Sequence, residues 1–189
     1  MNLDLPLRRR LLVYVPAFLA LVLLQLKLSL DGYRPQADFL MLLPLLAALW
    51  TPGYDPLFLG LAAGFIRDYA AGRGYGLGML AGMALALIGN RMARDGWRMY
   101  AIRGSILVVG ATLVHSWLLS ILAYLIPLEE GRANFVQVMR VWASHLPLSL
   151  VLNLAASLAI TAYLTLTLPW RTAAFSSSSA GPVKEVAHE

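Results

Sequence analysis

The stretch DPLFLGLAAGFIRDYAAGRGYGLGMLAGMALALIGN, residues 55–90, repeats a small or polar residue at every fourth position along two consecutive apolar segments. Four-residue spacing places such residues on one slowly rotating face of a helix. In a bilayer these faces let two backbones approach closely, because lipid supplies no hydrophobic force between helices. The stretch therefore predicts a hairpin of two tightly packed membrane helices. Its two faces comprise Pro56, Gly60, Gly64, Asp68 and Gly72, followed by Gly74, Gly78, Gly82, Ala86 and Asn90.

The composition of the chain is that of a membrane protein. Of its 189 residues, 59% are hydrophobic and 13% are charged. Soluble domains carry about 25% charged residues. A membrane span needs roughly 20 residues, so six spans use about 120 and leave only short loops. We therefore expect an all-α integral membrane protein with about six transmembrane helices. Its single membrane domain covers 11–168, between a cytoplasmic N-terminus at 1–10 and a disordered cytoplasmic tail at 169–189.

Six apolar segments can be drawn on the chain, and the second is unusually short. Because Pro44 also interrupts it, the second and third segments form either two full spans, which we favour, or a shallow or re-entrant hairpin. The first segment is too long for a signal peptide and lacks a small-residue cleavage site after it, which predicts an uncleaved span. The segments are 11–30, 38–51, 56–71, 75–92, 103–126 and 140–168.

Basic residues gather at the ends of these segments. Positive charge marks the cytoplasmic side of a membrane protein, so both termini and the loop from Asn90 to Arg103 are predicted to be cytoplasmic. Topology and attraction to anionic membrane lipids explain the net charge of +5, and we expect no nucleic-acid binding. The residues that carry this prediction are Arg8, Arg9, Arg10, Arg91, Arg94, Arg98 and Arg103.

Residues that could perform catalysis are hard to find in the chain. Cysteine is absent, which excludes disulfides, thiolate nucleophiles and cysteine-ligated metals. There are no paired carboxylates, no HExxH or GxSxG motif and no glycine-rich loop that follows a strand. We therefore expect no enzyme, no cofactor and no metal site.

Three polar residues lie inside the apolar segments. Asp68 could serve as a proton or ion site, or it could pair with Arg67, Arg73 or backbone amides; a single carboxylate favours the structural role. His115 and Asn153 lie at similar depth in the fifth and sixth segments, so we expect a hydrogen bond between them. Such a contact contributes about 1 kcal/mol or less in a membrane.

Two parts of the chain together form a recognisable pattern. An acidic residue opens the second segment in Asp38-Phe-Leu-Met-Leu-Leu-Pro. The glycine-spaced third segment then reaches Asp68, with Gly72 four residues on and Gly76-Leu-Gly78 shortly after. In these two parts the chain resembles the MreD family of bacterial rod shape-determining membrane proteins. The resemblance implies a bacterial inner-membrane protein whose fold is similar to the substrate-binding subunits of energy-coupling-factor vitamin transporters.

The same resemblance implies a non-catalytic scaffold of the cell-elongation machinery, which supports rod shape and lateral peptidoglycan synthesis. Its partners would be MreC and, through MreC, MreB, RodA and a class B penicillin-binding transpeptidase. The alternative is a vitamin-binding transporter subunit, and a third hypothesis is a proton-coupled carrier that uses Asp68. The vitamin hypothesis needs a polar pocket on the outer side, formed by Tyr33, Asp38, Trp117, Tyr124, Trp142 and His145.

Overall fold

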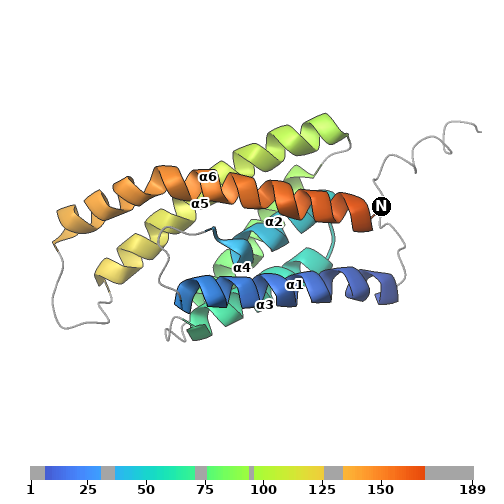
Figure 1. Ribbon diagram of the computed structural model, residues 1–189, viewed down its shortest axis with the longest axis horizontal. Helices are drawn as coiled ribbons and strands as arrows, with labels where there is room; N and C mark the ends of the chain where they lie inside the picture. The colour runs from blue at the N-terminus through green and yellow to red at the C-terminus, as the bar shows by residue number, and fades with distance from the viewer. Residues whose placement is uncertain (1–6, 31–36, 71–75, 94–95, 126–133, 169–189) are drawn as a thin grey trace, which may run out of the picture.

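The computed structural model describes residues 7–30, 37–70, 76–93, 96–125 and 134–168. Within these residues the chain forms six α-helices and no β-strand (Figure 1). The helices are α1 Leu7–Leu30, α2 Phe39–Trp50, α3 Asp55–Ala70, α4 Leu77–Met92, α5 Trp97–Leu125 and α6 Phe135–Thr167. Gly72, which belongs to the predicted packing face, lies outside the described residues, as do Arg94 and the predicted tail.

Three of the six helices are long and apolar enough to cross a membrane. The candidate spans are Arg8–Leu30, Trp97–Leu118 and Phe135–Thr167. By contrast, α2 has 12 residues and α3 and α4 have 16 each. At 1.5 Å per residue they cover about 18 to 24 Å, less than the roughly 30 Å of a hydrocarbon core. The all-α membrane class is therefore confirmed, whereas six full spans are not.

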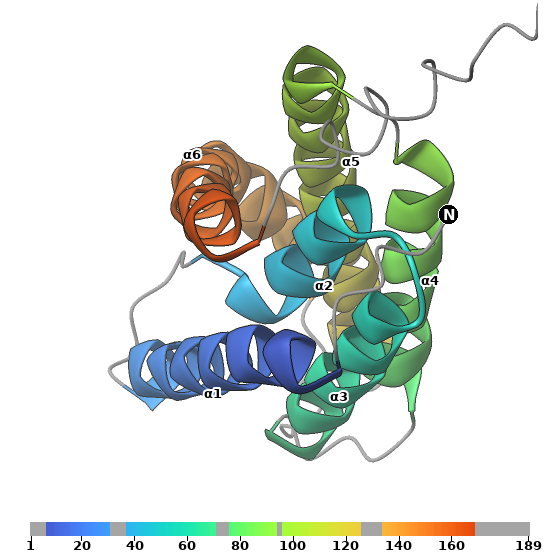
Figure 2. The ribbon, with the colours of Figure 1, turned by 90° about the vertical axis from the view of Figure 1, so that its right-hand side faces the viewer.

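The short helix α2 is the centre of the molecule. It packs against the other five helices, and Figure 2 shows it in their midst. Every residue from Leu40 to Trp50 is buried, and Leu42 and Leu45 are 0% exposed. A helix that is apolar on all sides is typical of a protein core. Its length and burial thus favour a core helix, packed against protein rather than lipid, over the full span that we favoured for this segment.

The hairpin α3–α4 brings two helices into backbone contact. A methyl group added to Gly60 would overlap the carbonyl of Gly82, and one added to Gly64 would overlap that of Gly78. Only glycine lets two backbones come this close. The other end of α4 contacts α2, where a methyl group on Gly89 would lie 2.7 Å from Cβ of Ala48. The hairpin and the core helix thus form one tightly packed unit.

The boundaries of α5 and α6 differ from the segments drawn on the sequence. The expected loop from Asn90 to Arg103 is mostly helical, since α4 continues to Met92 and α5 begins at Trp97. Arg103 donates a 2.6 Å hydrogen bond to the carbonyl of Met92, which satisfies a free carbonyl at the end of α4. At the start of α6, the Asn134 side chain accepts from Val136 N and caps the helix ahead of the expected start.

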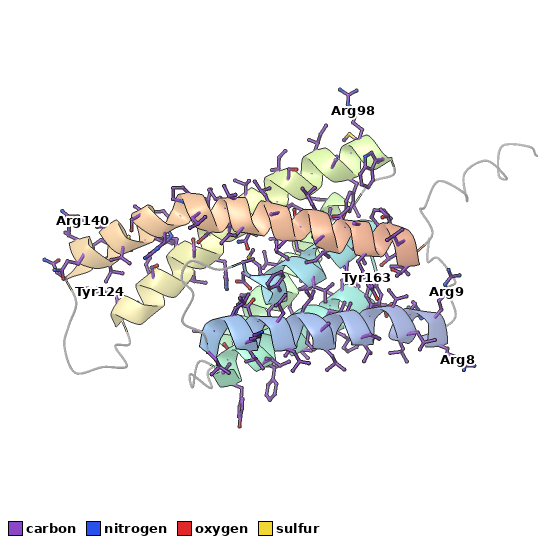
Figure 3. All side chains as sticks on the ribbon, in the orientation of Figure 1. Arg8, Arg9, Arg98, Tyr124, Arg140 and Tyr163 are labelled. Atoms are coloured by element: carbon purple, nitrogen blue, oxygen red, sulfur yellow. The ribbon has the colours of Figure 1, made fainter. Side chains whose placement is uncertain are left out.

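The two ends of the helix bundle carry different charged residues. Figure 3 places Arg8, Arg9 and Arg98 at one end, and Arg140 with Tyr124 at the other. At the arginine-rich end, Arg10 binds Asp55 at the start of α3, at 2.9 Å. At the opposite end, α5 and α6 extend beyond the other four helices (Figure 1).

Candidate functional site

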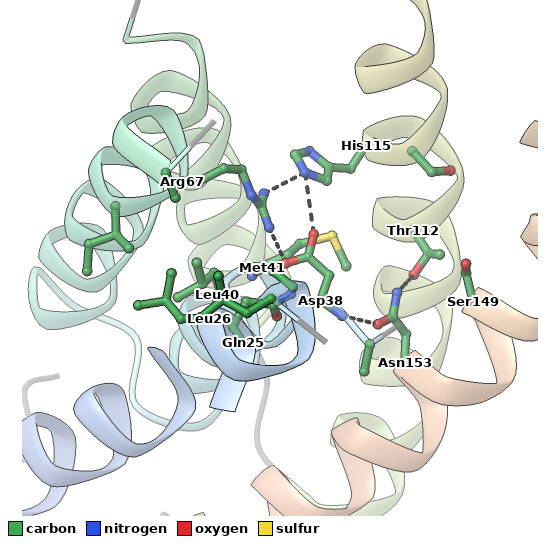
Figure 4. Close-up of a pocket in the computed structure, with 16 residues that line it drawn as sticks. Gln25, Leu26, Asp38, Leu40, Met41, Arg67, Thr112, His115, Ser149 and Asn153 are labelled. Atoms are coloured by element: carbon green, nitrogen blue, oxygen red, sulfur yellow. Dashed lines mark hydrogen bonds and ion pairs between the residues drawn. The ribbon is translucent and has the colours of Figure 1, made fainter. Parts of the chain in front are cut away.

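Three charged or titratable side chains meet inside the bundle, from α3, α5 and the residue that precedes α2. The guanidinium of Arg67 forms an ion pair with Asp38 and also contacts Nε2 of His115 (Figure 4). Nε2 of His115 lies 3.4 Å from Oδ2 of Asp38. Since a guanidinium can only donate, Nε2 accepts from Arg67, and the imidazole is neutral in this arrangement. Because the charges of Asp38 and Arg67 cancel each other, the three side chains together carry no net charge.

Hydrogen bonds from other helices hold Asp38 and the start of α2 in place. The backbone N–H of Asp38 donates to Oδ1 of Asn153 on α6 at 2.7 Å, and that of Phe39 donates to Oε1 of Gln25 on α1 at 3.0 Å. Oδ1 of Asp38 itself accepts from the N–H of Met41 at 3.1 Å. Free N–H groups at a helix start are costly in a membrane unless protein groups accept them. Together with the ion pair from Arg67 on α3, these bonds fix the first turn of α2 to three separate helices.

His115 and Asn153 belong to the same cluster, but the hydrogen bond that we expected between them is not formed. His115 contacts Arg67 and Asp38, whereas Nδ2 of Asn153 donates to Oγ1 of Thr112 at 2.9 Å. The prediction of their similar depth was sound. In place of the direct bond, Asn153 binds Thr112, which lies about one turn before His115 on α5, and Asp38 lies beside both His115 and Asn153.

These residues line a cavity of about 660 Å³ between α1, α2, α3, α5 and α6 (Figure 4). Pockets for small ligands are typically about 300–1,000 Å³ in volume. One wall is polar and carries Asp38, Arg67, His115 and Asn153, whereas aliphatic side chains such as Leu26 and Ile66 form another. Among the described residues that line the cavity, none is Phe, Tyr or Trp.

Asp68 lies outside this cavity and binds backbone. Its carboxylate accepts from the N–H of Gly78 at 2.9 and 3.0 Å, and from that of Met79 at 3.4 Å. An acidic group at this place satisfies free donors at the start of α4 and interacts favourably with the helix dipole. The structure therefore places Asp68 on backbone amides, one of the structural partners considered for it.

Arg67 is the functional residue that the sequence interpretation missed, since it was considered as a partner for Asp68 and not for Asp38. A signal was present, because a charge within an apolar segment needs a partner. Asp38 opens the preceding segment and is the acid that Arg67 reaches.

No model of a known protein family matches the chain, and no curated protein or solved structure matches it either.

Proposed function

We propose that this protein is a non-catalytic membrane scaffold of the bacterial cell-elongation machinery. It acts in the inner membrane through MreC and, through MreC, with MreB, RodA and a class B penicillin-binding transpeptidase. In this way it supports rod shape and lateral peptidoglycan synthesis.

The observation that carries the proposal is the structural role of the residues on which the MreD resemblance rests. Asp38 pairs with Arg67, Asp68 caps α4, and Gly60 and Gly64 contact the backbone of α4. All four hold helices against each other. A membrane core fixed in this way can present its outward faces to partners in a constant arrangement, as a scaffold requires.

The distribution of arginine supports a cytoplasmic location for both termini. Arg8, Arg9 and Arg98 gather at one end of the bundle, where α1 begins and α6 ends. Basic residues concentrate on the cytoplasmic side of membrane proteins. We therefore assign this end to the cytoplasm and the end at which α5 and α6 protrude to the outer side.

The two other hypotheses have less support from the contacts. Of the six residues suggested for a vitamin pocket, Asp38 lines the cavity, Tyr33 lies outside the described residues, and the remaining four are not part of its wall. A flat heteroaromatic vitamin would also find no described Phe, Tyr or Trp there to stack on. For a proton carrier, the carboxylate of Asp68 already binds two backbone amides.

Affinity purification from native membranes tests the scaffold proposal. We expect the tagged full chain to recover MreC, together with RodA and the transpeptidase, and we expect depletion of the chain to round the cells. As a control, the Gly110→Ala variant should recover the same partners as the wild type, because an added methyl group there has no atom within 4 Å. Recovery of a transporter ATPase in place of MreC, or unchanged cell shape after depletion, would contradict the proposal.

A further inference from the structure

The cavity beside Asp38 has hydrogen-bonding groups for which the described part of the chain supplies no partner. Among the described residues, no partner is present for the hydroxyl of Ser149 or for the amide nitrogen of Gln25, and both side chains line the cavity. Arg67 and Asn153 lie on the same polar wall. A bound molecule would therefore meet both donors and acceptors.

The polar wall of the cavity has no net charge, and this limits the charge that a bound molecule can carry. Asp38 and Arg67 neutralise each other, and their side chains are only 20% and 19% exposed. A net charge on the ligand would remain without a counter-ion, or would have to separate this pair, and both outcomes are costly away from water. An uncharged group that bears hydroxyls, such as a sugar, avoids either cost.

The position of the cavity indicates the route by which such a group enters it. Gln25 lies near the end of α1, and Ser149 lies on α6, on another wall of the same cavity. The helices α1 and α6 are hydrogen-bonded to each other far from the cavity, where Tyr163 donates to the carbonyl of Val13. Val13 is about 18 Å from Gln25 along α1 at 1.5 Å per residue. Access between α1 and α6 from the membrane therefore does not require that bond to break.

The surroundings of the cavity are suited to an acyl chain. Leu26 and Leu30 of α1 belong to the aliphatic part of the wall. Leu23 on α1 and Val151 on α6 are 67% and 61% exposed, so both helices also present apolar side chains to lipid. A head group in the cavity could thus remain attached to a chain that stays in the bilayer.

From these observations we infer that the cavity binds the uncharged, hydroxyl-bearing head group of a membrane lipid. The head group contacts Ser149, Gln25 and the polar wall, and its acyl chains lie along α1 and α6. This inference goes beyond the scaffold function, because partner assembly does not require a bound lipid.

Native mass spectrometry of the full-length protein tests the inference. The probes are monoglucosyl dioleoylglycerol and dioleoylphosphatidylglycerol at equal concentration, which share their acyl chains but differ in head-group charge. We expect one glucolipid to be retained per chain, with at least about tenfold preference over the anionic lipid, equivalent to the roughly 1.4 kcal/mol of one good contact.

Matched serine variants on α6 locate the site. Ser149→Leu should reduce glucolipid retention about tenfold, since it places a bulky side chain in part of the cavity and removes a hydroxyl. Ser149→Ala should reduce it less and leaves packing nearly unchanged. Ser157→Leu is the control, because Ser157 is also partly buried on α6, does not line the cavity, and donates to Leu154 O of its own helix.

Three results would overturn the inference. Retention that is equal in the wild type, Ser149→Leu and Ser149→Ala proteins would exclude the cavity as the site. Preference for the phosphatidylglycerol would contradict the neutral ligand. Displacement of the glucolipid by methyl β-glucoside at equal concentration would assign the site to a free sugar rather than to a lipid.

Discussion

The glycine hairpin and the Asp38 cluster hold the same bundle together in opposite ways. In the hairpin, α3 and α4 touch backbone to backbone, and the partners are near in sequence; Asp68 and Gly78 are separated by 10 positions. In the cluster, side chains join helices that are remote in sequence. Asp38 and Asn153 are separated by 115 positions, and Arg67 and His115 by 48. One region depends on the absence of side chains, and the other on their charge.

The two kinds of contact differ in the substitutions that they tolerate. A close backbone contact tolerates no added volume but carries no charge. A paired cluster has room around it, as the adjoining cavity shows, but it cannot lose one member without leaving the other unpaired. The two regions should therefore respond to different substitutions.

The largest effect is expected in the cluster, for Asp38→Asn. Asparagine retains an oxygen that can cap α2, so the loss isolates the charge on Arg67. Removing one partner of a buried ion pair costs about 3–5 kcal/mol, and the partial exposure of this pair places the expected loss near 3 kcal/mol. The measurement is the free energy of unfolding in detergent, followed by circular dichroism.

Asp55→Asn is the matched control for this experiment. Asp55 pairs with Arg10 at 2.9 Å, but those side chains are 29% and 36% exposed, so the loss should stay below about 1 kcal/mol. The double variant Asp38→Asn with Arg67→Gln should be more stable than Asp38→Asn alone. Equal losses for Asp38→Asn and Asp55→Asn would show that the lower exposure of the Asp38–Arg67 pair makes no difference to its contribution.

The sequence predicts the hairpin well because its signal is local. Small residues at every fourth position indicate a close helix contact without any knowledge of the rest of the fold. Gly60, Gly64, Gly78 and Gly82 therefore stood out at once, and the structure places all four at the contact. The length of α2 was harder to interpret, because an apolar segment interrupted by Pro44 fits a core helix as well as a short span.

A moderate effect is expected in the hairpin, for Gly64→Ala. The new methyl group would overlap the carbonyl carbon and oxygen of Gly78, so α3 and α4 must move apart. Such overpacking costs about 1–3 kcal/mol. Gly110→Ala on α5 should be neutral or slightly stabilising, because its methyl group meets no atom within 4 Å and alanine favours helix. If the two alanine variants unfold at the same denaturant concentration, the close contact does not limit stability.

The cluster could be predicted only in part, for a physical reason. His115 and Asn153 were recognised as polar residues at one depth, but depth alone does not show which side chain each of them binds. Arg67 reaches Asp38 because α2 and α3 pack side by side, and that arrangement results from the whole bundle rather than from local spacing. Side-chain partners remote in sequence depend on tertiary packing, whereas backbone contacts in a hairpin do not.

The smallest effect is expected for Asp68→Asn, which sharpens the comparison because the substitution is the same as at Asp38. Asparagine and aspartate are nearly equivalent caps, so an amide oxygen can still accept from the N–H of Gly78. The interaction of the charge with the α4 dipole is lost together with the long hydrogen bond from the N–H of Met79, which costs at most about 1 kcal/mol. Unfolding in detergent measures this loss beside Asp38→Asn. A loss near 3 kcal/mol would show that Asp68, too, acts through a charged partner, and it would contradict the role of Asp68 as a cap of α4.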